Sequence, residues 1–300
     1  MVDEEQFEVV GDGLLVRAPA KINLSLLVNG RRPDGYHEIR TVMAKVNWYD
    51  ELLIEKSEKA GIELICGGKY WSPEGEENLV YKACELFCES AGIKPALKVT
   101  LTKNVPAGGG LGSGSSDAAA VLLGLNKLFE TTMSDKKLGD MASRLGSDAP
   151  FFLGGPLAVC SGRGEKIEKI RKIFRFAAIL MLPNISVCTR SVYENFRQEP
   201  AEYQALNERI NEYIEKNRID LITNLCANML FKSCLEINKE LAELKQRIEV
   251  LSGCPVCLTG SGSTLYMLFT GAEERKAEML QKKLTESISC ESVIVSSNRW

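Results

Sequence analysis

The sequence has little of several features that mark common functions. It holds one histidine, His37, among 300 residues, and aromatic residues make up 7%. A single histidine excludes His-rich zinc sites and leaves one candidate for any Ser-His-Asp arrangement. The net charge is −3 and no basic tract is present. A nucleic-acid partner is therefore not expected, because such proteins carry a clustered positive charge.

Long hydrophobic runs are also absent, since no eighteen apolar residues follow one another. The acidic start "MVDEEQFEVVGDG" lacks the basic and apolar regions of a signal peptide. We therefore expect a cytoplasmic protein with no membrane partner, whose ten cysteines are reduced and buried. Cys254 and Cys257 form C-P-V-C, but no second C-x-x-C completes a zinc site, which favours structural thiols.

The content of 45% hydrophobic residues is enough for a sizeable core. Hydrophobic periodicity predicts strands over residues 14–29, 39–55, 62–66, 96–103, 256–269 and 291–296, and helices near residues 78–91, 115–130 and 135–145. One further helix, ending before Gly253, is predicted from the spacing of Ile237, Leu241, Leu244, Ile248 and Leu251. The alternation is too irregular for a doubly wound sheet. We predict an α+β fold with domains over residues 1–170 and 171–300.

A glycine-rich segment, "NVPAGGGLGSGSSDAAAVLLGL", spans residues 104–125, with five glycines directly before a predicted helix. Glycine lets the backbone approach a ligand without Cβ atoms, and a helix start exposes amide groups that bind phosphate oxygens. Ser115, Ser116 and Asp117 suit the cap of that helix. The segment lacks both the lysine of a P-loop and the spacing of a dinucleotide fingerprint. It therefore predicts a polyphosphate site of another kind.

Three segments together resemble the GHMP kinases, the superfamily of galacto-, homoserine, mevalonate and phosphomevalonate kinases. The segment "PAGGGLGSGSSDAAA" (106–120) is similar to their phosphate loop, "APAKINLSLLVNGRRPDGYHEI" (18–39) to their first motif and "LTGSGSTLYMLF" (258–269) to their third. The three occur in the order of that family. The resemblance implies an ATP-dependent kinase with Mg²⁺ carried by the nucleotide. It also implies a ribosomal-S5-like N-terminal half that binds ATP and a ferredoxin-like C-terminal half on the substrate side.

The resemblance further implies which residues form the site. It places Asp148 beside Lys21, where the carboxylate would orient the attacking hydroxyl and accept its proton while the ammonium keeps the aspartate ionised. On the adenine side it implies Asn78, Leu79 and Lys103. Around the phosphates it implies Pro106, Ala107, Gly108, Gly109, Gly110, Leu111, Gly112, Ser113, Gly114, Ser115 and Ser116. Asp117 stands where some members of the family have asparagine.

Within the superfamily, "GRRPDGYHEI" and "GSDAPFFLGG" (146–155) resemble the branch that phosphorylates the 2-hydroxyl of a cytidine-diphospho sugar alcohol in non-mevalonate isoprenoid synthesis. The residues implied for that substrate are Asn23, Tyr36, His37, Tyr193, Gly260, Ser261 and Gly262. Tyr36 and Tyr193 would sandwich the cytosine, and a neutral His37 would accept a hydrogen bond from its amino group. Two alternatives remain open: another GHMP kinase, of homoserine or mevalonate type, and a non-catalytic nucleotide-binding regulator. The sequence gives no indication of the oligomeric state.

Overall fold

A computed structural model describes residues 5–172, 174–270 and 273–300 of the chain. In this part, seven strands form one sheet and four form another. The strands of the first sheet are β1 (Phe7–Val10), β2 (Gly13–Arg31), β3 (His37–Lys56), β4 (Gly61–Gly68), β5 (Ala96–Lys103), β6 (Leu157–Gly162) and β7 (Lys166–Lys169). Those of the second sheet are β8 (Phe176–Leu182), β9 (Cys257–Leu258), β10 (Leu265–Thr270) and β11 (Glu291–Ser296).

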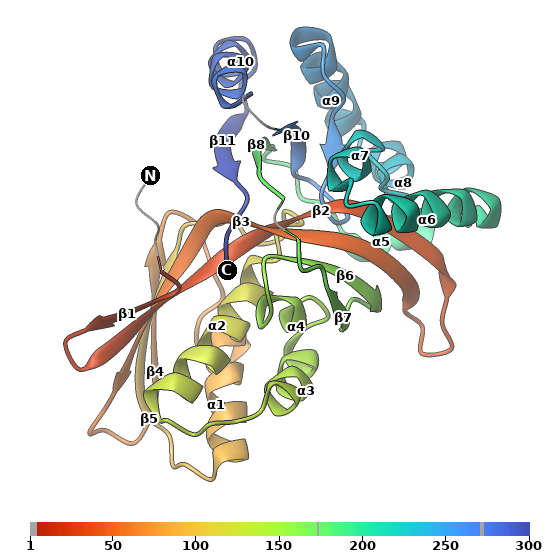
Figure 1. The fold of residues 1–300 in the computed structure, drawn as a ribbon. Coiled ribbons are helices and arrows are strands. Elements are labelled where there is room, and N and C mark those ends of the chain that lie inside the picture. Colours follow the sequence, from red (N-terminus) through yellow and green to blue (C-terminus); the bar gives the residue numbers. More distant parts are fainter. Residues whose placement is uncertain (1–4, 173, 271–272) are drawn as a thin grey trace.

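The two long strands β2 and β3 run through the middle of the molecule (Figure 1). They pair antiparallel, and the pairing shifts by two residues between Pro19 and Lys21 and by one residue between Asn23 and Ser25. One half of β3 pairs with β6 and the other half with β5, which in turn pairs in parallel with β4. Helices lie on one side of these strands, and the second sheet with its own helices lies on the other (Figure 1).

The helices of the N-terminal part are η1 (Gly75–Glu77), α1 (Leu79–Ala91), α2 (Ser113–Leu128), α3 (Asp135–Leu145) and α4 (Ala149–Phe152). The alanine-rich α2 packs directly on the sheet. A Cβ atom at Gly124 would lie 2.6 Å from the Ile54 side chain, so this glycine allows the close approach. The helix start at residue 113 is thereby fixed relative to β2, which carries the first motif.

The helices of the C-terminal part are α5 (Thr189–Asn195), α6 (Pro200–Glu215), α7 (Ile219–Asn224), α8 (Phe231–Ile237), α9 (Lys239–Ser252) and α10 (Glu274–Ser287). The strand order of the second sheet is β11-β8-β10-β9, with antiparallel pairs throughout. The guanidinium of Arg40 on β3 donates hydrogen bonds to the amide oxygens of Asn207 and Asn211 on α6. The two parts also share a hydrophobic cluster, which includes Leu26 of β2 and Leu180 of β8, while two further clusters lie within the N-terminal part.

The α+β prediction is confirmed, and most predicted elements lie within a few residues of the observed ones. One exception is the range 256–269, where a loop separates β9 from β10. Another is the helix before Gly253. Ile237 is the last residue of α8 and is 42% exposed, while α9 begins at Lys239. The helix is interrupted at Asn238, which lies between α8 and α9 and whose side-chain amide donates to the carbonyl of Cys234. Side-chain spacing could not reveal this break, because residues 237 and 241 keep the same separation in sequence.

The proposed division of the chain near residue 170 falls between β7, the last strand of the first sheet, and β8, the first strand of the second. We keep the two ranges as a proposal.

The expectation of ten reduced, buried thiols is wrong for Cys226 and Cys257, which form a disulfide, and Cys188 is exposed. The Cα atoms of the disulfide lie 5.3 Å apart, within the range that such a bond spans. The amide of Leu26 donates to the carbonyl of Ala227, and the carbonyl of Leu26 accepts from the amide of Met229. Between them, the side-chain amide of Asn228 donates to the carbonyl of Leu258 on β9, so the segment after α7 lies beside β9. Because the two cysteines are 31 residues apart, their pairing could not be read from local sequence.

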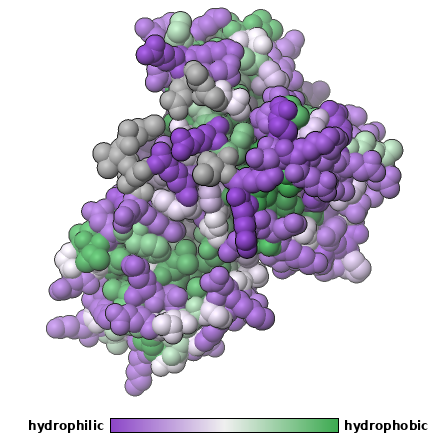
Figure 2. Space-filling model, in the orientation of Figure 1, coloured by the Kyte–Doolittle hydropathy of each residue, from purple (hydrophilic) through white to green (hydrophobic). Residues whose placement is uncertain are grey.

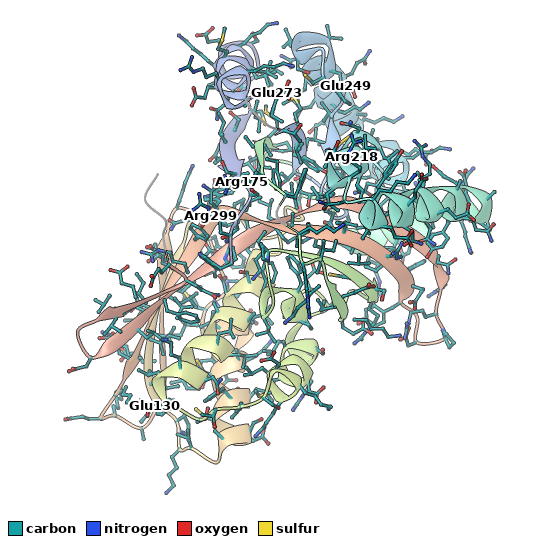
Figure 3. All side chains as sticks on the ribbon, in the orientation of Figure 1. Glu130, Arg175, Arg218, Glu249, Glu273 and Arg299 are labelled. Carbon is teal, nitrogen blue, oxygen red and sulfur yellow. A yellow bond between two sulfur atoms is a disulfide. The ribbon has the colours of Figure 1, made fainter. Side chains whose placement is uncertain are left out.

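Hydrophilic residues cover most of the face shown in Figure 2, and hydrophobic ones gather in its lower part. Charged residues such as Glu130 and Glu249 lie at the outer ends of the two parts (Figure 3). Within the described residues, no helix combines the length and the apolar composition needed to cross a bilayer.

Lys45 on β3 provides a test of the buried electrostatics. Its ammonium donates to the carbonyls of Phe152 (3.1 Å) and Gly154 (2.7 Å), and burial lowers its pKa to about 7. An unfolded lysine has a pKa near 10.4. Between about pH 7 and pH 10 the unfolded chain therefore binds more protons than the folded one, and stability rises with pH.

We predict that Lys45→Met removes this dependence. The free energy of unfolding of the wild type should rise relative to that of the variant by up to about 1.4 kcal/mol per pH unit. Urea titrations at several pH values above neutrality measure the difference. Lys94→Met, at an exposed position, is the matched control and should show no trend. If the free energies of unfolding of the wild type and Lys45→Met differ by the same amount at every pH, the prediction is wrong.

Candidate active site

A cavity of about 1260 Å³ lies between β2, the glycine-rich loop, the start of α5 and the loop that joins β9 to β10. Most of the residues predicted from the sequence line it. Those that do not line it are Pro106, Gly109, Leu111, Ser116 and Gly262. The motifs, far apart in the chain, thus converge on one space that is large enough for two ligands end to end.

Lys21 and Asn23 point into this cavity from β2. They lie two residues apart, beside the two shifts in the pairing of β2 with β3, and such bulges re-aim side chains next to active sites. The Lys21 ammonium is buried, lies 3.3 Å from Oδ2 of Asp148 and donates to Oδ1 of Asn23 at 2.7 Å. The lysine is therefore held on one side and presents its charge to Asp148 on the other.

Asp148 precedes the short helix α4 but makes no capping hydrogen bond with its side chain. The side chain is 28% exposed, and Asp148 lines the cavity. Burial raises the pKa of the Tyr193 hydroxyl, and the negative charge of Asp148 raises it further, which puts this tyrosine within electrostatic reach of the carboxylate. The carboxylate is thus partly exposed at the cavity wall and makes no capping hydrogen bond.

The start of α2 differs from the expectation. Gly112, with φ of +70°, is the N-cap, and no side chain caps the helix. Ser115, Ser116 and Asp117 lie inside the first turns, because the positive φ of Gly112 begins the helix earlier than the serines suggested. The amides at the start of this 16-residue helix therefore have no side-chain partner and line the cavity at Ser113, Gly114 and Ser115. Such a helix start fits phosphate oxygens.

The glycine-rich loop also contacts the third motif. A Cβ atom at Gly110 would lie 2.2 Å from the carbonyl oxygen of Thr259, and one at Gly260 would lie 3.0 Å from Cα of Gly110. The hydroxyl of Thr259 donates to the carbonyl of Gly110 at 3.0 Å. Gly110 is required by this contact between backbones, whereas the sequence had suggested room for a phosphate.

Asn23 joins the first and third motifs. Its Oδ1 accepts hydrogen bonds from Lys21 and from the amide of Gly260 (2.8 Å), and its backbone amide donates to the hydroxyl of Thr259 (3.2 Å). Its Nδ2 donates to the hydroxyl of Thr41 at 2.8 Å. Most of its hydrogen-bonding capacity is therefore used within the protein, which makes Asn23 a positioning residue as well as part of the cavity wall.

At one end of the cavity lie Asn78, Leu79 and Lys103. Asn78 caps α1 by accepting from the amide of Val80 at 2.9 Å. The ammonium of Lys103 lies between the carboxylates of Asp50 and Asp117, at 2.5 and 2.8 Å. Burial alone would lower the pKa of Lys103, but the two carboxylates outweigh it and raise the pKa.

At the other end lie Tyr36, His37 and Tyr193. The expected sandwich of a base between the two tyrosines is not preformed, because the His37 ring stacks on Tyr193 with centroids 4.8 Å apart. The guanidinium of Arg163 lies 5.0 Å from the centre of the Tyr36 ring. Burial and the charge of Arg31 lower the pKa of His37, so its ring is neutral at pH 7.

Sequence reasoning missed Asp50, Thr259 and Arg163. The only signal for Asp50 was a charged residue inside the apolar strand pattern "NWYDELLI". Thr259 belongs to the third motif but was not singled out, and Arg163 lies in a glycine-bearing turn without a distinctive pattern.

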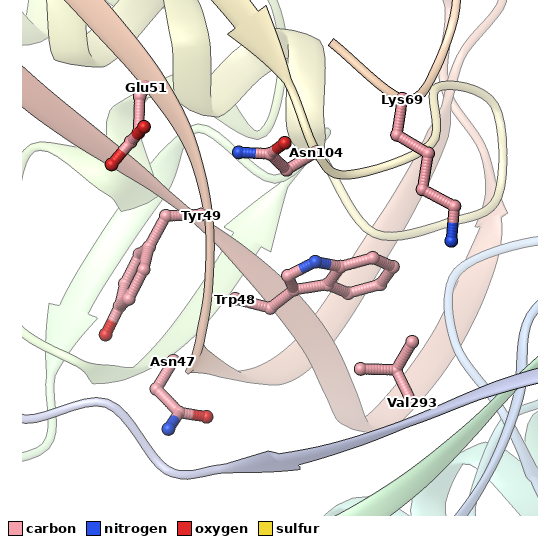
Figure 4. A pocket seen from close by; sticks show the side chains of 7 residues that line it. All are labelled: Asn47, Trp48, Tyr49, Glu51, Lys69, Asn104 and Val293. Atoms are coloured by element: carbon pink, nitrogen blue, oxygen red, sulfur yellow. The ribbon is translucent and has the colours of Figure 1, made fainter. Parts of the chain in front are cut away.

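A second, smaller recess of about 420 Å³ is lined by Asn47, Trp48, Tyr49, Glu51, Lys69, Asn104 and Val293 (Figure 4). None of the residues predicted for the site lies in it, and it contains no helix start or glycine loop. The larger cavity is therefore the candidate active site.

Comparison with known proteins agrees with this geometry. The family of GHMP kinases N terminal domains matches residues 78–155, and that of GHMP kinases C terminal domains matches residues 210–287. A 4-diphosphocytidyl-2-C-methyl-D-erythritol kinase of Macrococcus caseolyticus is 39% identical over 89% of this chain and 93% of its own. The chain belongs to the 4-diphosphocytidyl-2-C-methyl-D-erythritol kinases of the GHMP family.

Solved structures support the same assignment. A crystal structure of 4-(cytidine 5'-diphospho)-2C-methyl-D-erythritol kinase aligns with a TM-score of 0.72 at 31% identity, covering 95% of this chain and all of the other. A homoserine kinase from Cytophaga hutchinsonii aligns with a TM-score of 0.75 at 19% identity over 99% of this chain and 98% of its own. The second likeness shows the fold alone. As a GHMP kinase, the protein is a small-molecule kinase that uses ATP.

The contact between the glycine-rich loop and the β9–β10 loop can be tested with two glycine variants. Gly108 and Gly110 both have positive φ, +76° and +78°, but a Cβ at Gly108 meets nothing within 4 Å. Gly108→Ala should therefore cost only the conformational strain, about 1–2 kcal/mol of unfolding free energy. Gly110→Ala should cost roughly 2 kcal/mol more, because the methyl group must displace the Thr259 carbonyl. Chemical denaturation of the two variants measures the difference, and equal losses would show that the two loops are not in close contact.

Proposed function

We propose that this kinase transfers the γ-phosphoryl group of ATP to the 2-hydroxyl of 4-diphosphocytidyl-2-C-methyl-D-erythritol. The observation that carries the proposal is the pairing of Asp148 with Lys21, 3.3 Å apart, at the middle of the cavity. On one side of this pair is a glycine loop with a free helix start, suited to a polyphosphate. On the other side is an aromatic wall suited to a planar base.

The site residues fit a nucleoside triphosphate. The amides at the start of α2 have no side-chain caps, and a Cβ at Gly108 would point into open space. We propose that these amides bind the phosphate oxygens and that Asn78, Leu79 and Lys103 lie against the adenine. Among the described residues, no group of three or more His, Cys, Asp and Glu side chains could hold a metal ion. We propose that Mg²⁺ enters with the nucleotide and neutralises charge on the phosphates.

Asp148 would act on the acceptor hydroxyl. Its carboxylate orients the hydroxyl and takes its proton, while the hydroxyl oxygen forms a bond to the γ-phosphorus and the bond to the bridging oxygen of ADP breaks. The Lys21 ammonium supplies a fixed positive charge beside this point. Asn23 keeps Lys21 in place and connects it to the third motif. Phosphoryl transfer needs little covalent chemistry from the protein, so this positioning is the main contribution.

The alternatives make different predictions. A homoserine or mevalonate kinase would share the glycine loop but would have no use for a neutral histidine stacked on a tyrosine. A non-catalytic regulator would not need a buried lysine beside an aspartate whose side chain makes no capping hydrogen bond. The cytoplasmic location remains an expectation from the sequence.

One experiment distinguishes these functions. The protein is incubated with ATP, Mg²⁺ and either 4-diphosphocytidyl-2-C-methyl-D-erythritol, homoserine, mevalonate or galactose, and the release of ADP is followed. The proposal expects ADP with the cytidine substrate only. Turnover of another acceptor instead would refute the proposed substrate, and nucleotide binding without turnover of any acceptor would favour the regulator.

We predict that Asp148→Asn lowers kcat by about 10²-fold or more, because the amide cannot take the proton of the hydroxyl. The fold should be retained, since the Asp148 side chain makes no capping hydrogen bond. Steady-state kinetics and thermal melting measure both quantities. The matched control is Asp135→Asn, in the first turn of α3 and outside the cavity, which should leave kcat unchanged. A folded Asp148→Asn enzyme with near-normal kcat would remove this residue from the mechanism.

We predict that His37→Ala lowers kcat/KM for the cytidine substrate and narrows its preference over the uridine analogue. A neutral ring nitrogen accepts from the cytosine amino group, whereas uracil presents a carbonyl there, so the wild-type preference should be roughly 10²-fold. Tyr193→Phe keeps the ring on which His37 stacks and should keep the preference. If His37→Ala retains the full preference, another group recognises the base edge.

A further inference from the structure

We propose that Lys45 is a positioning residue for the phosphoryl transfer, because it holds in place the turn that carries Asp148. The proposal rests on the proposed role of Asp148 and adds a residue that does not line the cavity. Lys45 lies on β3 directly opposite Lys21 on β2, and it is 1% exposed. Residues directly opposite each other on antiparallel strands point to the same face of the sheet. Both lysines therefore face the turn formed by residues 148–154.

The turn of residues 148–154 is held together by its own backbone. The amide of Phe151 donates to the carbonyl of Asp148 at 3.2 Å, and the amide of Gly154 donates to the carbonyl of Phe151 at 3.2 Å. The helix within it, α4, has four residues, which are too few to be stable alone. The position of Asp148 at the start of the turn therefore depends on the contacts that fix its other end.

Lys45 provides these contacts at the end of the turn. Its ammonium donates to the carbonyls of Phe152 (3.1 Å) and Gly154 (2.7 Å), and its backbone amide donates to the carbonyl of Pro156 (2.8 Å). In the described part of the chain, the Phe152 and Gly154 carbonyls have no other hydrogen-bond donor. Burial lowers the pKa of Lys45, but a neutral amine keeps two N–H donors, so both contacts exist in either protonation state.

Loss of the lysine would leave the two carbonyls without a donor. A buried carbonyl without a partner is unfavourable, so the end of the turn would shift toward water or another donor. The turn also touches the groups around the point of transfer. A Cβ at Gly112 would lie 3.0 Å from the Phe152 ring and 3.1 Å from the stem of Lys21, so ring and stem both pack against the start of α2.

A shift of the turn would therefore change how Asp148 faces Lys21, which lies 3.3 Å away. A misplacement of about 1 Å at a reacting group can lower a rate by about 10²-fold, even when the mutation is far from the chemistry. Lys21 and Lys45 thus hold the two ends of one turn. Lys21 contacts the carboxylate that acts on the ligand, and Lys45 fixes the backbone that carries this carboxylate.

Lys45→Met tests this role, because methionine matches the lysine stem but carries no donor. We expect kcat to fall by about tenfold or more, while the dissociation constant of a non-hydrolysable ATP analogue stays within about twofold. Steady-state kinetics and isothermal titration calorimetry measure these quantities. The matched control is Ile248→Ala, at a fully buried position of α9 that does not line the cavity. It should lower Tm and leave kcat unchanged.

A double-mutant cycle separates positioning from a general structural role. If Lys45 acts through Asp148, adding Lys45→Met to Asp148→Asn should lower kcat no further, because the group that it positions is already lost. A merely structural residue would lower kcat by the same factor in both backgrounds. That result overturns the proposal, as does a folded Lys45→Met enzyme whose kcat is within about twofold of the wild-type value.

The crystal structure of Lys45→Met provides a measurement that needs no substrate. The Lys21 ammonium and the Asp148 carboxylate should lie more than about 4 Å apart, beyond the range of an ion pair. An unmoved turn with this ion pair intact would show that Lys45 does not position Asp148. If the wild type phosphorylates no cytidine substrate, the proposed function fails, while the distance between Lys21 and Asp148 still tests the role of Lys45.

A second variant applies if Lys45→Met does not fold. Lys45→Gln has a shorter side chain that cannot reach both carbonyls, and it should show the same loss of kcat and the same displacement of Asp148. If neither variant folds, Lys45 is required by the fold as a whole, and the proposal of a positioning role is wrong.

Discussion

The contact between the backbones of Gly110 and Thr259 is the constraint on which the site depends. The two residues come from different halves of the chain, and no side chain larger than glycine fits at position 110. Because the contact holds the β9–β10 loop against the phosphate loop, the amide of Gly260 can reach Asn23, and Asn23 can hold Lys21. The charge that faces Asp148 is thus positioned by a contact in which neither partner is charged.

Two lysines lie at opposite ends of the phosphate loop, and their surroundings give them different roles. Lys21 is buried but its partner Asp148 is 28% exposed, so the pair faces the cavity, where the proposed mechanism requires it. Lys103 lies between two buried carboxylates and is enclosed. Lysine and aspartate therefore form a pair that faces the cavity at Lys21 and an enclosed ionic cluster at Lys103. The two differ in how far the aspartate side chain is exposed.

Much of this site could be predicted from sequence because its motifs are local. The glycine loop, the strand with Lys21 and Asn23, and the turn with Asp148 are each continuous segments, and the structure brings them to one cavity. What could not be predicted depends on contacts between distant segments. Asp50 is 53 residues from Lys103, and Thr259 is 149 residues from Gly110. Helix boundaries failed where a backbone conformation decided them, as at Gly112, whose positive φ starts α2 before its serines.

The arrangement of the cavity also explains why the two ligands would not exchange places. The helix start of α2 offers unpaired amides at its centre, and only an anion is stabilised there. From that point the wall toward Asp117 offers polar groups fixed by Lys103, while the wall toward Tyr193 offers an aromatic face with a neutral histidine on it. Both ends accept a planar base, but a purine and a pyrimidine present different hydrogen-bonding edges. On the proposed placement of the two ligands, the polar atoms at each end, more than the shape of the cavity, would therefore determine which nucleotide binds there.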